Sequence, residues 1–217
     1  AAEALFAEKA FENVSIRELS AAAEVNVAAV NYHFQGKENL FAEVVRRRFI
    51  AQRDRTLADL EALLRETGGQ PALDRVIEIL VGNHLASALA EAGRPTFMAL
   101  MGRETSADHT LENATFFKEL VAPIFRAYSA ALLEARPDLD QEQINWFMAS
   151  IVGQVHHFIF RRQKWDSLPE GSEPRAFMQQ AFPALALPRD AYVAEATRHI
   201  TRFSTAAIDG LRGEVTT

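Results

Sequence analysis

The chain has 217 residues, 48% of them hydrophobic, and a formal net charge of −6 at pH 7. This length allows one large or two small domains, and the apolar content is ample for a buried core. The lack of cysteine excludes disulfides and zinc–thiolate sites, and no apolar run approaches the ~20 residues of a membrane span, so we expect a cytoplasmic protein without a membrane partner.

Two short helices joined by a tight turn are predicted near the start of the chain. Ser15 and Glu18 have the spacing of a capping box, which satisfies amide donors at a helix start. Asn26 is a favourable N-cap for a second helix from Val27 to about Phe34. This arrangement predicts a helix-turn-helix, in which the second helix presents its N-terminal residues to base edges.

The second helix carries side chains that suit base readout. Small residues at its start would let the backbone approach the groove floor, and their methyl groups suit contacts with thymine. Asn31, one turn later, can pair with adenine through two hydrogen bonds, and Arg17 could reach guanine or a phosphate. The same alanine-rich run could instead be ordinary core. The negative net charge does not exclude DNA binding, because residues 25–37 contain no acidic residue and only the docking face meets phosphate.

Residues 4–37 resemble the DNA-binding domain of the TetR family of bacterial transcriptional regulators. Residues 5–11 resemble the end of that family's first helix and the following turn, and residues 15–20 resemble its second helix. Residues 25–34, with Gly36 and Lys37, are similar to the recognition helix and the start of the fourth helix. The ending Asn31-Tyr32-His33-Phe34 resembles a CerR-like branch. The chain also departs from the commonest pattern, which has tyrosine at the position of Asn31, so relatives do not give its operator sequence.

The resemblance implies a homodimeric repressor that leaves its DNA operator when a small ligand fills a C-terminal pocket. Matched to the family pattern, the base-reading positions are Arg17, Val27, Ala28, Ala29 and Asn31. The phosphate-contacting positions are Tyr32, His33 and Lys37, and the helix start at Ser15 offers amides for a further phosphate.

Helical periodicity continues along the chain without a convincing strand, so we expect an all-α fold. The sequence begins inside an apparent helix, and we expect further residues before Ala1. Longer helices are predicted over residues 38–65, 73–89, 141–165 and 189–211, with shorter ones near 96–104 and 177–188 and a buried stripe from Phe117 to Leu132. We expect a three-helix DNA-binding head at residues 1–48 and a helical ligand-binding and dimerisation bundle at residues 49–217.

The C-terminal bundle has candidate residues for an apolar effector pocket. His84 lies on the apolar stripe of its helix, where a core role and a ligand contact are both compatible with the pattern. The other candidates are aromatic, methionine or arginine side chains, and they predict an apolar or aromatic effector: Phe97, Met101, Arg103, Phe117, Phe125 and Tyr128. No histidine spacing predicts a metal site, and nothing in the sequence indicates a cofactor.

The helix over residues 141–165 is apolar on more than one side. Ile144, Met148, Ile151, Val155 and Phe158 form one face, and a narrower strip of small residues includes Ser150, Gly153 and His157. Small residues let two helices approach closely. We therefore predict a four-helix dimer interface built from this helix and the last one, with contacts at Ser150, Gly153, His157, Ile200 and Phe203; the alternative is that both helices pack only within the protomer.

Other functions remain open at this point. One is an all-helical enzyme or small-molecule carrier whose head is only structural, with polar candidates at Glu104, Asp108, His109, Glu112 and Glu119. Their spacing fits no metal or nucleophile pattern, so we expect that the protein is not an enzyme. Another is an activator or a ligand-independent regulator that keeps the DNA-binding head.

Overall fold

The structure is a computed structural model, and it describes residues 1–9, 11–89 and 117–210. These residues form helices and turns, and no strand occurs among them. They divide into two compact units, one containing Ala1–Ala51 and the other containing residues 52–89 and 118–210. The boundary between residues 51 and 52 falls inside one long helix.

The first unit contains the predicted head. It consists of α1 (Ala2–Glu8), a 3-10 turn η1 (Phe11–Asn13), α2 (Ile16–Ala22), α3 (Val27–Phe34) and the first half of α4 (Lys37–Glu66). Its core is a small apolar cluster with one buried residue from each helix and one from the loop after η1, and the Phe6 ring in it contacts the rings of Phe11 and Phe41, which also contact each other. The buried members are Phe6, Val14, Leu19, Val30 and Leu40.

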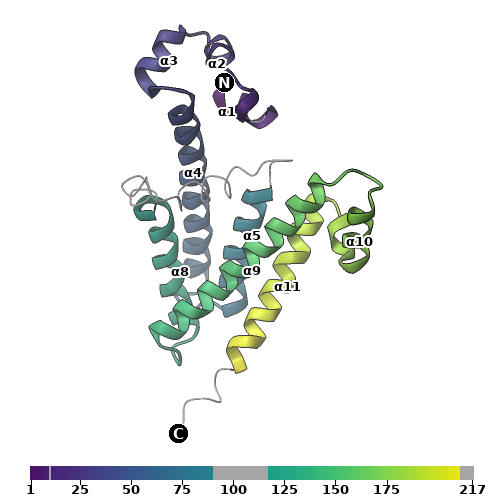
Figure 1. The fold of residues 1–217 in the computed structure, drawn as a ribbon. Coiled ribbons are helices and arrows are strands. Elements are labelled where there is room, and N and C mark those ends of the chain that lie inside the picture. Colours follow the sequence, from purple (N-terminus) through teal and green to yellow (C-terminus); the bar gives the residue numbers. More distant parts are fainter. Residues whose placement is uncertain (10, 90–116, 211–217) are drawn as a thin grey trace. The chain divides into compact units, whose positions relative to one another are not determined.

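The second unit is a helical bundle around a larger core. It comprises the rest of α4, α5 (Leu73–Leu89), all but the first residue of a π-helical turn η2 (Phe117–Val121), α8 (Ala122–Ala135), α9 (Gln141–Ser167), α10 (Glu173–Ala181), a 3-10 turn η3 (Pro183–Ala186) and α11 (Arg189–Gly210). In this unit α11 packs on α5 and α9, and α8 packs on α5 and α9 (Figure 1). The predicted inner face of α9, from Ile144 to Phe158, is buried throughout.

Helix boundaries agree closely with the predicted ones where a side chain caps the start of the helix through a hydrogen bond. Asp140 caps α9 through a capping box with Gln143, and α3 has the predicted limits of Val27 and Phe34. Two predictions need correction. α9 continues to Ser167 and α10 begins at Glu173, so the loop between them is shorter than expected.

The predicted buried stripe before residue 132 is only partly correct. Tyr128 and Leu132 are buried, but Val121 and Phe125 are 37% and 39% exposed. The buried side of α8 is centred on Ala127, Tyr128 and Ala131, and Phe125 falls at its edge. The π-helical turn before α8 adds a residue to the helical repeat and shifts the register of the residues after it, a change that simple periodicity does not capture.

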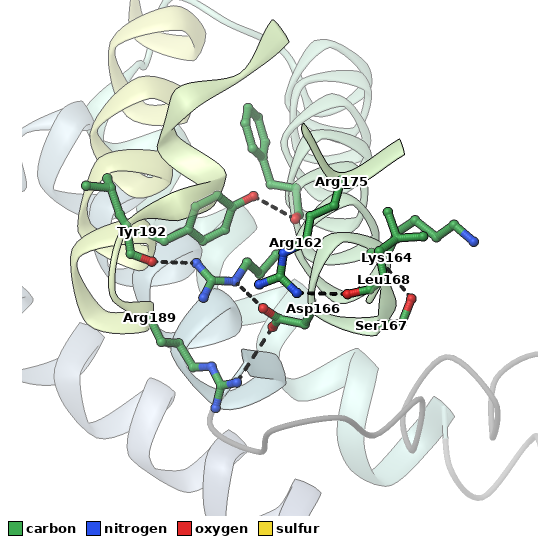
Figure 2. A network of polar contacts seen from close by, with 10 residues as sticks. Arg162, Lys164, Asp166, Ser167, Leu168, Arg175, Arg189 and Tyr192 are labelled. Carbon is green, nitrogen blue, oxygen red and sulfur yellow. Dashed lines mark hydrogen bonds and ion pairs between the residues drawn. The ribbon is translucent and has the colours of Figure 1, made fainter. Parts of the chain in front are cut away.

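A buried arginine joins the end of α9 to the start of α11 (Figure 2). Arg162 is 6% exposed; its Nε pairs with Asp166 Oδ1 at 3.1 Å and its Nη1 donates to the Leu187 carbonyl at 2.9 Å. The guanidinium lies 5.2 Å from the Trp165 ring and 5.1 Å from the Tyr192 ring. The charge of the Arg162 guanidinium is therefore paired inside the bundle, and the group also lies against two aromatic rings.

The surrounding contacts extend this network to α10. Tyr192 donates its hydroxyl to the Phe158 carbonyl at 2.8 Å, and burial raises the pKa of Tyr192 to about 12. Arg175 of α10 lies 4.0 Å from the Trp165 ring and donates to the Leu168 carbonyl at 2.8 Å. α10 has no fully buried residue, and it is held by these Arg175 contacts together with Met178, which packs against the core.

Candidate nucleic-acid interface

The helix-turn-helix is set by local hydrogen bonds at two helix starts. The Ser15 side chain accepts from the Glu18 amide at 3.1 Å, and the Glu18 carboxylate accepts from the Ser15 amide at 3.2 Å, which is the predicted capping box. Asn26 Oδ1 accepts from the Ala28 amide at 2.9 Å. Glu24 in the turn and Gln35 after α3 both adopt left-handed backbone angles, with φ of 55° and 56°. These contacts fix where α3 begins and ends.

The side chains of α3 separate into an inner and an outer side. Val30 is 6% exposed in the head core and Phe34 packs against that core. The outer side contains Ala28, Asn31, Tyr32 and His33, all exposed, while Val27 and Ala29 are half-buried. The interpretation of the whole alanine-rich run as core is therefore wrong for Ala28.

The flanking candidates differ in how free they are to meet DNA. Ser15 and Arg17 are exposed at the start of α2. Lys37 is half-buried: its Nζ donates to the Phe11 carbonyl at 3.0 Å and lies 4.2 Å from the Phe11 ring. A lysine ammonium has three donors, so a phosphate contact can share Lys37 with Phe11. The lysine also fastens the start of α4 to η1, a role that sequence reasoning missed.

Two acidic side chains of the head, Glu18 and Glu43, are held in ion pairs. Glu18 pairs with Lys9, and Glu43 accepts from both Arg46 and Arg47 within one turn of α4. The hydrogen bond from Lys9 holds the pKa of Glu18 below its usual value, and the hydrogen bond from Arg46, followed by that from Arg47, does the same for Glu43. These pairs reduce the repulsion that the carboxylates would exert on phosphate.

The effector-pocket candidates are only partly located. Phe97, Met101 and Arg103 lie outside the described residues, as do Glu104, Asp108, His109 and Glu112, and Phe117 is described only through its backbone in η2. Phe125 is exposed. Tyr128 is fully buried, burial raises its pKa, and its hydroxyl has no hydrogen-bond partner among the described residues.

His84 is half-buried on α5 and meets a second histidine. Its ring centroid lies 5.4 Å from that of His156 on α9, with the two rings nearly perpendicular. Burial, followed by the charge of His156, lowers the pKa of His84 to about 4. In the described part of the chain no group of three or more His, Cys, Asp or Glu side chains could hold a metal ion.

The His84 pKa predicts an acid-sensitive second unit. Because the folded pKa of about 4 lies below the ordinary 6.5, the unfolded chain binds a proton more readily, and stability falls as the pH drops from about 6.5 to about 4. The expected loss is on the order of 1–3 kcal/mol, since one pKa unit corresponds to about 1.4 kcal/mol. Urea unfolding at a series of pH values measures it. His84→Gln should flatten the slope, and the exposed His33→Gln should not; an unchanged slope in His84→Gln contradicts this assignment.

The predicted dimer residues fall into two groups. Ser150, Gly153 and His157 are exposed on α9, and Phe203 on α11 is 59% exposed. Ile200 is completely buried in the protomer's own core, so a place in an intersubunit contact is wrong for this residue. It faces inward because residues 196, 200, 204 and 208 form the inner side of α11.

Sequence reasoning overlooked two large side chains on the same face of α9. Trp146 is 70% exposed and Phe160 is 60% exposed. Together with Ser150, Gly153 and His157 they recur at alternating intervals of four and three residues, the spacing of a coiled-coil seam. We call these five residues the α9 stripe. The spacing of these residues is visible in the sequence. Only the structure shows that they are exposed on the protomer and not buried in its own core.

Comparison with known proteins places both halves of the chain. The model of "Bacterial regulatory proteins, tetR family" matches residues 1–44, and that of "Tetracyclin repressor-like, C-terminal domain" matches residues 78–186. No curated protein was found to match. Among the described helices none has an apolar stretch long enough to cross a bilayer. With the capped helix-turn-helix at one end and half of its residues in the C-terminal match, the chain belongs to the TetR family of bacterial DNA-binding transcriptional regulators.

Proposed function

We propose that this regulator is a homodimeric repressor that leaves a near-palindromic operator when a small molecule binds its C-terminal unit. The outer side of α3 is the observation that carries the DNA-binding part. Base contacts are assigned to Arg17, Val27, Ala28, Ala29 and Asn31, and phosphate contacts to Ser15, Tyr32, His33 and Lys37. The Asn31–Phe34 ending favours a place in the CerR-like branch, and a repressor of this kind acts in the bacterial cytoplasm.

The α9 stripe supports the dimer. Exposed apolar surface on a helix is costly in water, and an exposed tryptophan and phenylalanine at seam spacing are typical of an interaction face. Phe203 on the neighbouring α11 adds to this surface, and its ring stacks with His199 at 6.3 Å. Two copies related by twofold symmetry would bury both helices of each protomer. Their recognition helices would then enter successive major grooves about 34–36 Å apart.

The buried hydroxyl of Tyr128 supports an effector site in the second unit. This hydroxyl has no partner among the described residues, which is unfavourable for a buried group, and a hydrogen-bond acceptor on a bound molecule would satisfy it. We propose an apolar or aromatic effector with one such acceptor.

Release from DNA requires that the effector favours a form whose recognition helices no longer match the groove spacing. A shift from 1:99 to 99:1 takes about 5.5 kcal/mol of differential binding. We propose that α4 transmits the effect of the ligand to the head, because this helix runs without interruption through the boundary between the two units.

Asn31→Ala tests base reading. The variant should lose about 1–3 kcal/mol of discrimination between operator and random DNA, because one bidentate adenine contact disappears. Titration of both duplexes at the same salt concentration measures this loss, with Asn13→Ala in η1 as the control asparagine. An equal loss of affinity for the two duplexes would show that Asn31 does not read bases.

A further inference from the structure

We infer that Tyr32 is a base-reading residue and that Ala28 and Tyr32 form an apolar stripe that recognises thymine methyl groups. The proposed function follows the family pattern in giving Tyr32 a phosphate contact, whereas the geometry of α3 turns Tyr32 to the floor of the groove and replaces that contact. The inference rests on the proposed entry of α3 into the major groove, and it names the chemistry that the protein recognises there.

Tyr32 lies on the side of α3 directly opposite the head core. Val30 and Phe34, which face the core, are each two positions away, and two positions correspond to about 200° around an α-helix. The Tyr32 side chain is 83% exposed accordingly. Ala28 is exposed one turn earlier on the same side, while Asn31 and His33 flank this line. A helix lying in the major groove turns its outer residues to the base edges, and the middle of that outer side lies closest to the groove floor.

Exposed apolar surface in the described part of the head is concentrated at this motif. The large hydrophobic side chains exposed there are Val25, at 46%, in the turn before α3, and Tyr32. Val30 and Phe34 of α3 face the core, and Val27 is half-buried. Thymine is the base that presents an apolar group, its C5-methyl, in the major groove. The exposed apolar surface of α3 therefore matches a major groove that presents thymine methyl groups better than a groove that presents only hydrogen-bonding groups.

Side-chain length increases along the stripe in the direction that docking requires. A recognition helix contacts base edges first through its N-terminal residues, so its later turns lie further from the floor. Alanine occupies the near position, at residue 28, and the longer tyrosine occupies the position one turn later. Both can then reach bases from one inclined helix.

His33 holds the Tyr32 ring in a defined direction. Their ring centroids are 5.2 Å apart and the ring planes meet at 83°, an edge-to-face contact. Aromatic pairs favour this geometry, and it restricts the rotation of an otherwise exposed tyrosine. His33 thus acts as a positioning residue for the stripe.

Replacing thymine with deoxyuridine tests the inference because it removes only the methyl group. The sequence bound by the full chain is first selected from random duplexes, and each thymine of one half-site is then replaced singly. The wild-type protein should lose about four-fold in affinity at one or two positions, the factor expected for ~0.8 kcal/mol per buried methyl. Tyr32→Ala should be insensitive at one of these positions, and Tyr32→Phe should keep the sensitivity. Asn13→Ala, at an exposed position in the η1 turn, is the control and should keep it as well.

Measurements at low salt concentration keep the affinity of weakly binding variants within the measurable range, because phosphate contacts are stronger at low salt. Ala28→Gly is an independent test of the stripe. This variant should no longer lose affinity when a neighbouring thymine is replaced by deoxyuridine. Wild-type binding that is indifferent to every methyl, or full sensitivity in Tyr32→Ala, would overturn the inference while leaving sequence-specific binding intact. If the wild-type chain selects no sequence at all, the proposed function fails instead.

Discussion

Gly153→Arg is expected to leave the protomer folded and to abolish the dimer. A Cβ built on Gly153 meets no atom within 4 Å, so the protomer has room for a larger side chain. In the proposed interface this position lies at the centre of the α9 stripe, where a small residue lets two helices approach closely. An arginine there would separate the helices and bring a charge into an apolar seam.

The effect on DNA binding should be far larger than that of any single base contact. Two linked heads bind cooperatively, and losing the second head is expected to lower operator affinity by about 10²- to 10⁴-fold. Sedimentation measures the oligomeric state, circular dichroism checks helix content, and operator titration measures affinity.

Ala130→Arg provides the control for Gly153→Arg, because Ala130 is an exposed small residue on α8 outside the stripe. It should remain dimeric and bind normally. A Gly153→Arg protein that stays dimeric with unchanged operator affinity would refute the four-helix interface.

Arg162→Ala should destabilise the second unit by about 3–5 kcal/mol. Removing one member of a buried ion pair leaves its partners unsatisfied, and that cost is several-fold larger than for an exposed pair. Here the Asp166 carboxylate would keep only Arg189, 3.6 Å away, and the Leu187 carbonyl would lose its donor. The stacking with Trp165 and Tyr192 would disappear as well.

Urea unfolding followed by tryptophan fluorescence measures this loss, because both tryptophans of the chain, Trp146 and Trp165, lie in the second unit. Arg198→Ala is the matched control: Arg198 pairs with Glu195 on the exposed side of α11, and such pairs contribute about 0–1 kcal/mol. A loss for Arg162→Ala no larger than that of the control would contradict the role of the network.

The head was predictable because short-range rules decide its structure. Capping at Ser15 and Asn26 depends on residues within one turn, so the sequence alone located α2 and α3 to within a residue or two. The outward position of Asn31 followed from the cost of burying the three adjacent polar or amphipathic side chains Asn31, Tyr32 and His33. The hydrogen bond from Lys37 to the Phe11 carbonyl did not, since it joins residues 26 positions apart.

The second unit was less predictable where contacts between helices decide the outcome. Arg162 and Arg136 are both nearly fully buried, although arginine is ordinarily a surface residue. Arg136 is tied to Asp138 and Asp209, and its hydrogen bond to Asp138 raises its pKa. No local pattern indicates that Arg136 also meets Asp209, 73 positions away, or that Arg162 donates to the Leu187 carbonyl, 25 positions away. Ile200 and Phe203 illustrate the same limit, because periodicity gave α11 an apolar side without saying which residues the protomer itself covers.

Selection of bound sequences from random duplex DNA tests the central claim most directly. If the outer side of α3 reads bases in a symmetric dimer, the selected sequences should contain two inverted half-sites whose centres are about one helical turn, or a multiple of it, apart. The α3 variants should alter the selected bases within each half-site. Recovery of a single unpaired site, or of no preferred sequence at any salt concentration, would contradict the account.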